Sequence, residues 1–138
     1  MIAQVNVNFW AVLVAAIASM VVGFIWYGPL FGKSWMKLMN IDMNKTKDKK
    51  KGMGKMYFIT FIASLITGYV LAHIISYTQS TTVSDAALAA FWNWLGFMLP
   101  LLIGSILWEG KPAKLFFINA VYWLVNLLVM ASILVAWP

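Results

Sequence analysis

Hydroxyl and amide side chains inside long apolar stretches are the residues of this chain best suited to chemistry. They recur at spacings of three, four or seven residues, which place them on one helix face: Thr60, Ser64 and Thr67 in one stretch, Asn119 and Asn126 in another. Lipid gives an apolar helix no reason to carry polar groups, so these groups mark a functional path or a helix contact. One interpretation is a polar axis that binds or conducts a small solute. The alternative is interhelical hydrogen bonding that only holds the helices together.

Three further side chains are candidates for a ligand or proton site: Glu109, His73 and Trp123. Glu109 is either a proton-coupling or cation-binding carboxylate, or a loop carboxylate that pairs with the nearby lysines. His73 lies near the end of an apolar stretch, where it either senses pH or is simply an interfacial polar residue. Trp123 lies mid-stretch, so its ring either lines an aromatic cavity or fills a dense core.

The residue inventory argues against catalysis. The chain has no cysteine and a single histidine, which excludes thiolate chemistry, disulfides and a multi-histidine metal site within one chain. No nucleophile–base pair, metal cluster or cofactor motif can be assembled from the sequence. We therefore expect no enzyme, no cofactor and no metal.

Composition places the candidate residues in a membrane. Hydrophobic residues make up 63% of the chain and charged residues 10%, whereas soluble domains carry about 25% charged residues. Four apolar stretches each approach the roughly 20 helical residues that cross a bilayer core: residues 9–27, 56–77, 86–108 and 113–137. The pattern predicts an all-α fold, an integral membrane four-helix bundle that forms one domain over residues 1–138. Pro100 is expected to kink the third span.

The lysines predict the orientation. Every lysine lies in residues 29–55, between the first two spans, or in the turn between the last two, at Lys111 and Lys114. The positive-inside rule then places both basic segments in the cytoplasm and both termini outside. This arrangement corresponds to a multi-pass protein of a bacterial cytoplasmic (inner) membrane.

The long basic segment has two parts. Residues 30–41 mix apolar side chains with Lys33 and Lys37, a pattern typical of an amphipathic segment at the interface. A polybasic run follows: Lys45, Lys47, Lys49, Lys50 and Lys51. We expect this run to bind anionic lipid headgroups of the bilayer rather than nucleic acid, because it is juxtamembrane and lacks arginine and interleaved aromatic residues.

The two halves of the chain resemble each other. Trp10 and Trp26 flank the first span with the same spacing as Trp92 and Trp108 in the third, and Lys55 and Lys114 open the second and fourth. The pattern predicts two duplicated helical hairpins, a parallel repeat about an axis along the membrane normal. It also favours self-association, most simply as a dimer.

Several motifs resemble one family of small bacterial membrane proteins. They are Trp26-Tyr27-Gly28-Pro29-Leu30-Phe31-Gly32-Lys33, Met53-Gly54-Lys55, Tyr69-Val70-Leu71-Ala72-His73, Trp94-Leu95-Gly96-Phe97 and Glu109-Gly110-Lys111. The chain is similar over nearly its whole length to the family catalogued as domain of unknown function 1761. That resemblance implies four helices and no established activity.

These observations leave two functions from different classes. The first is a small transport or channel-like module with a polar axis between its repeats. The second is a non-catalytic scaffold or accessory subunit of a membrane complex, held together by aromatic and glycine packing. The first predicts a hydrated or ligand-filled space beside the polar residues, and the second a dry seam.

Overall fold

The computed structural model describes residues 4–39 and 53–138, and every regular element within those ranges is helical. In chain order the elements are α1 (Phe9–Ile25), the π-helical turn η1 (Trp26–Leu30), α2 (Gly32–Leu38), α4 (Met53–Tyr77), α5 (Val83–Asn93), the π-helical turn η3 (Trp94–Met98), α6 (Leu99–Leu107) and α7 (Ala113–Ala136). Four continuous helical stretches are long and apolar enough to cross a membrane: Phe9–Leu30, Gly54–Tyr77, Val83–Leu107 and Ala113–Ala136. The prediction of four helical spans is therefore confirmed. The polybasic run from Lys45 to Lys51 lies outside the described residues.

Side chains at the helix starts provide the hydrogen bonds that the first turns lack. Asn8 Oδ1 accepts from the backbone N–H groups of Trp10 and Ala11, at 3.1 and 3.3 Å. Thr82 Oγ1 accepts from the N–H of Asp85 at 3.1 Å at the start of α5. Both residues are preferred N-caps because their oxygens reach the free N–H groups of the first turn.

Both π-helical turns lie beside a proline. Pro29 lies inside η1, and Pro100 lies two residues after the end of η3, at the second position of α6. Proline has no N–H and crowds the preceding turn, so a regular α-helical ladder cannot continue through it. In the third span one wider turn, η3, interrupts the ladder shortly before Pro100, and the kink itself stays a prediction.

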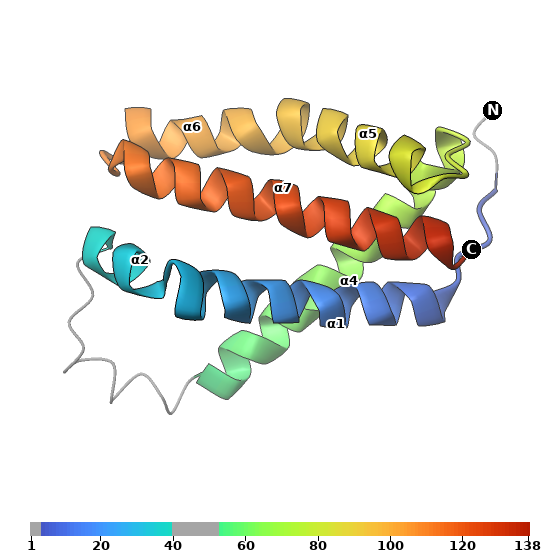
Figure 1. Ribbon diagram of the computed structural model, residues 1–138, viewed down its shortest axis with the longest axis horizontal. Coiled ribbons are helices and arrows are strands. Elements are labelled where there is room, and N and C mark those ends of the chain that lie inside the picture. The colour runs from blue at the N-terminus through green and yellow to red at the C-terminus, as the bar shows by residue number, and fades with distance from the viewer. Residues whose placement is uncertain (1–3, 40–52) are drawn as a thin grey trace.

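α7 is the central helix of the bundle. Figure 1 shows α7 between the α5–α6 span and α1, with α4 crossing behind, and α1, α4 and α5 each pack against it. Alanines make these close contacts, with Ala11 and Ala15 on α1 and Ala86 and Ala90 on α5 all buried. Small residues let helix backbones approach in a membrane, where packing rather than water exclusion drives association. The core therefore runs along the faces of α7.

The apolar surface of the bundle points outward. Leu101 is 79% exposed, Phe97 73% and Trp108 87%. In water such a surface would aggregate, whereas the bilayer solvates it. This pattern fits helices whose outer faces contact lipid.

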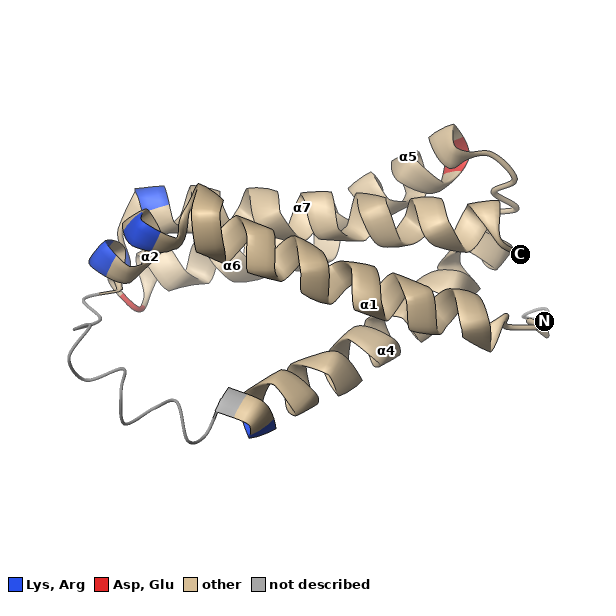
Figure 2. Cartoon of the chain, turned by 60° about the horizontal axis from the view of Figure 1, so that its bottom comes forward, with Lys and Arg blue, Asp and Glu red and all other residues tan. Residues whose placement is uncertain are grey.

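The lysines of the described segments lie at one end of the bundle. Figure 2 shows the basic residues of α2, the start of α4 and the start of α7 at the same end. We call this the lysine end and the opposite one the far end. The duplication of the two hairpins stays a prediction. α1 packs on both α4 and α7, whereas α5 packs mainly on α7 and little on α4.

Candidate functional site

A cavity of about 720 Å³ lies in the lysine half of the bundle and is lined by α1, η1, α2, α4, α6 and α7. It is called the aromatic cavity below. Its lining residues are Ser19, Met20, Gly23, Phe24, Tyr27, Gly28, Trp35, Tyr57, Thr60, Leu102, Asn119, Tyr122 and Trp123. Figures 1 and 2 both show α4 diverging from α1 and α6 toward the lysine end, and the cavity occupies this region.

The turn η1 brings Tyr27 to the cavity. Phe31 N donates to Trp26 O across five residues at 2.9 Å, which widens the turn around Pro29. A Cβ at Gly32 would lie 2.6 Å from Tyr27 O, so the chain approaches itself too closely there for any side chain. Gly32 therefore allows α2 to start directly against η1 and to bring Trp35 beside Tyr27.

Two hydrogen bonds fix η1 on α7. Tyr27 Oη donates to Asn119 Oδ1 at 2.6 Å, and Trp26 Nε1 donates to Ile118 O at 3.1 Å. The Tyr27 bond uses the oxygen of the Asn119 amide, so the two amide hydrogens are the groups that Asn119 can offer a ligand. The pair forms a polar rim on an otherwise aromatic cavity.

The aromatic walls pack edge against face. Tyr27 meets Trp35 and Tyr122 with ring centroids 5.7 and 5.0 Å apart, and Tyr122 meets Trp123 at 5.0 Å. Tilted and edge-to-face pairs at these distances are the favourable aromatic geometries. The walls are thus held in place by one another and present ring faces and hydroxyl groups to the cavity.

The inner side of the cavity carries hydroxyl groups from α1 and α4. Ser19, which is buried, lies with its Oγ 3.4 Å from the Oγ of buried Ser64. Thr60 donates to Met56 O one turn back on α4, at 2.8 Å. Ser64 therefore holds α4 to α1, whereas Thr60 lines the cavity.

Asn126 is the most deeply buried polar residue near this site. Its side chain is 1% exposed, and its Oδ1 has no hydrogen-bond partner. Its Nδ2 makes only a long contact with Met130 Sδ, at 3.8 Å. A buried polar atom without a hydrogen-bond partner lowers the stability of the folded protein, so such atoms are rare and often have a functional role.

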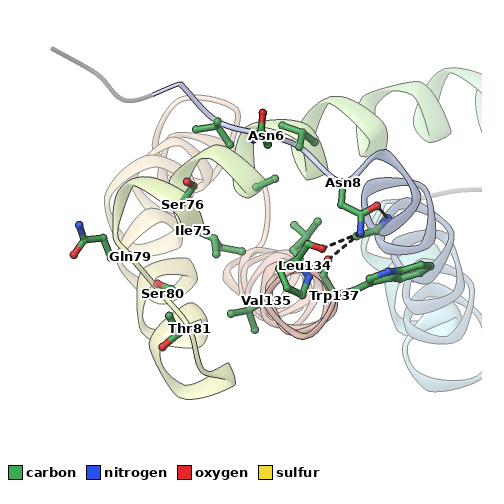
Figure 3. A pocket seen from close by; sticks show the side chains of 15 residues that line it. Asn6, Asn8, Ile75, Ser76, Gln79, Ser80, Thr81, Leu134, Val135 and Trp137 are labelled. Atoms are coloured by element: carbon green, nitrogen blue, oxygen red, sulfur yellow. Dashed lines mark hydrogen bonds between the residues drawn. The ribbon is translucent and has the colours of Figure 1, made fainter.

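A second, smaller cavity of about 320 Å³ lies at the far end and is lined by the extended segment before α1, α4 with the turn that follows it, and the end of α7. Figure 3 shows Ile75 of α4 opposite Leu134 and Val135 of α7, with Ser76, Ser80 and Thr81 around the rim. Asn8 Nδ2 donates to Trp137 O and Pro138 O at 3.3 and 3.2 Å. These bonds tie the start of α1 to the end of α7 beside the cavity.

The candidates of the polar axis separate into three places. Thr60 and Asn119 line the aromatic cavity, whereas Ser64 and Asn126 are buried between helices. Thr67 donates to Ala63 O at 3.0 Å and lines a shallow apolar groove of about 330 Å³ between α4 and the α5–η3 region. The common axis proposed from spacing is thus divided between a cavity, a seam and an outer groove.

The other candidates also separate. Trp123 lines the aromatic cavity. His73 lies on the surface of α4 between Tyr69 and Tyr77, and its Nδ1 is 2.8 Å from Tyr69 O. Glu109 is exposed in the turn after α6 and lines none of the cavities described above.

The sequence did not single out Tyr27 or Ser19 as site residues, although both line the aromatic cavity. The sequence signal that could have located Tyr27 is the Trp26-Tyr27-Gly28-Pro29 motif. Its proline widens the helical turn that carries Tyr27. For metal binding, the described ranges contain no group of three or more acidic or histidine side chains close enough to hold an ion.

The fold and the cavity define a class: a four-span helical membrane protein with a neutral, aromatic, partly polar cavity in one half of its bundle. The family comparison then places the chain. Residues 10–135 match the family described as Protein of unknown function (DUF1761), and the chain belongs to that family. A search of curated proteins and a search of solved structures each found no match.

Proposed function

We propose that the protein is a small transport module whose substrate path follows the seam between α1, α4 and α7. The observation that carries the proposal is the aromatic cavity, which brings together Asn119 of α7 and Thr60 of α4, two residues that polar spacing had singled out. Lined cavities of this size and mixed apolar and polar character are typical of small-molecule sites. A scaffold held together only by packing has no need for such a space.

The far-end cavity gives the path its second opening. Both cavities are lined by α1, α4 and α7, at opposite ends of the seam. Ser19 lines the first cavity and Ala11 the second, two turns of α1 apart. One seam thus carries a pocket toward each membrane face.

Between the two cavities the seam is closed. A Cβ at Gly68 would lie 3.4 Å from both Met130 Cε and Val12 Cγ1, so α1, α4 and α7 touch there. Val12, Leu71 and Met130 are all buried in this region. Such a plug fits a carrier that opens to one side at a time rather than a continuously open channel.

The lysine end is proposed to face the cytoplasm of a bacterial inner membrane, by the positive-inside rule. The lysines at that end then lie near anionic headgroups, the lipid partner expected from the sequence. Self-association remains part of the proposal, since the exposed apolar faces allow it.

The test is flux into proteoliposomes. Umbelliferyl glucoside is uncharged, carries an aromatic ring and hydroxyl groups, and crosses lipid slowly. With β-glucosidase trapped inside, fluorescence of the freed umbelliferone reports entry. We expect entry above that of protein-free vesicles, and its loss in Asn119→Leu. Thr67→Val is the matched control, because Thr67 lies on the outer groove and not in the cavity. Entry no faster than in protein-free vesicles, or entry unchanged in Asn119→Leu, would reject the proposal.

A further inference from the structure

A buried hydrogen-bond acceptor, Asn126 Oδ1, lies beyond the inner lining residues of the aromatic cavity. On α7 the cavity is lined by Asn119, Tyr122 and Trp123, and the next residue on the same face is Asn126. On antiparallel α1 the same direction runs from Tyr27 through Gly23 to Ser19, the last α1 residue of the lining. Asn126 therefore lies one turn past Tyr122 on α7, just beyond the residues that line the cavity.

Contacts between α1 and α7 show which residues of the two helices lie opposite each other near Asn126. Tyr27 meets Asn119 through the 2.6 Å hydrogen bond, and Tyr122 Oη lies 3.3 Å from the position a Cβ would take at Gly23. One turn further along the two antiparallel helices, Ser19 and Asn126 stand at the same level. On the other side of Asn126 lies Met130, which is fully buried and whose Sδ contacts Asn126 Nδ2 at 3.8 Å.

The charges around the cavity select the substrate. Of the described residues, none that lines the cavity is charged, so an anion finds no partner there and pays its full desolvation. The lysines at this end oppose a cation that approaches the mouth. The side chains that remain are ring faces, hydroxyl groups and amides, which suit an uncharged molecule.

We infer that the site takes an uncharged molecule with an aromatic or other flat apolar body and an O–H or N–H donor, and that Asn126 Oδ1 accepts the hydrogen bond from that donor. This inference rests on the proposed function and names its substrate class. The ring packs against the aromatic walls, and the donor group reaches Asn126 Oδ1, while Asn126 Nδ2 keeps its contact with Met130 Sδ. The unpartnered oxygen then has a function: it is left without a protein donor because its donor comes with the substrate.

Binding to the purified protein tests the inference separately from flux. Trp35 and Trp123 line the cavity, and their emission is quenched by energy transfer to a bound umbelliferyl ring. The two probes are umbelliferyl glucoside and its fully O-methylated ether, which keeps the ring and loses every donor. We expect the glucoside to bind about tenfold tighter or more than the ether, the ratio that one well-placed hydrogen bond provides.

Variants of Asn126 test whether this residue causes the preference for the glucoside over the ether. In Asn126→Leu the preference for the glucoside falls about tenfold while the ether binds as before. Asn93→Leu is the matched control, because its amide bonds Ala89 O on another helix, at 2.8 Å, and lies outside the cavity. Asn126→Ala removes the same acceptor without adding bulk, should the leucine disturb packing.

The outcomes separate the two proposals. Equal binding of both probes to the unmodified protein, or a preference that survives Asn126→Leu and Asn126→Ala, overturns the inference and leaves Asn119-dependent flux standing. Binding of neither probe overturns the inference, whereas absent flux overturns the proposed function whatever the binding result.

Discussion

Replacing Asn126 by leucine should stabilise the protein. The side chain is 1% exposed, its Oδ1 has no partner, and its only contact through Nδ2 is the 3.8 Å approach to Met130 Sδ. A buried polar atom without a partner costs about 1–3 kcal/mol. Leucine branches at the same carbon and has the same number of side-chain heavy atoms, so it removes that cost with a moderate gain in volume. We expect the free energy of unfolding to rise by about 1–3 kcal/mol.

Reversible unfolding by SDS in mixed micelles, followed by tryptophan fluorescence, measures the change. The control is Asn93→Leu, whose amide makes a 2.8 Å bond to Ala89 O. This control should be neutral or lose up to about 1 kcal/mol, the range found for hydrogen bonds between helices in membranes. A loss of stability in Asn126→Leu larger than that in Asn93→Leu would refute the reasoning, because it would mean that Oδ1 has a partner in the protein.

Three further substitutions test how the site is held. Tyr27→Phe removes the 2.6 Å bond to Asn119 and should lower stability by about 0.6–1.7 kcal/mol in the same SDS assay, with an unchanged midpoint as the contrary result. Gly32→Ala places a Cβ about 2.6 Å from Tyr27 O, so it should abolish flux by displacing η1, and retained flux would show that the turn is dispensable. Asn8→Ala removes the α1 cap and the bonds to the carbonyls of Trp137 and Pro138, so it should cost about 1 kcal/mol in the same SDS assay; an unchanged midpoint would count against that tie.

The spans followed from the sequence because length and apolarity alone decide which segments cross a bilayer. An irregularity near Pro100 was expected for an equally local reason, the missing N–H of proline, and the π-helical turn η3 lies shortly before it. Thr60 and Asn119 were singled out because polar groups in apolar helices are costly, and both line the cavity.

Side-chain neighbours did not follow from the sequence. Spacing places Ser64 on the same face as Thr60, but only packing shows that Ser64 meets Ser19 on α1. Trp26 and Trp108 look equivalent as landmarks of a repeat, yet Trp26 donates to Ile118 O whereas Trp108 is 87% exposed. Helical periodicity shows which residues share one face of a helix, but it does not show which helix packs against that face. The duplication of the two hairpins therefore stays a prediction.

The central claim is that an aqueous or ligand-accessible cavity lies beside α4 at the lysine end. The chain has no cysteine, so a single introduced thiol reports its own surroundings without background. Thr60 and Thr67 are a matched pair, since both lie on α4 and both donate to the carbonyl one turn back, at 2.8 and 3.0 Å. Thr60 lines the cavity, whereas Thr67 lines the apolar outer groove.

The most direct measurement is the labelling rate of Thr60→Cys and Thr67→Cys by an uncharged, hydrophilic, membrane-impermeant thiol reagent in vesicles that expose the lysine end. The account predicts rapid labelling at position 60 and little at position 67. Equal rates, or faster labelling at position 67, would contradict it, because the cavity would then be closed or the groove would be the wetted surface.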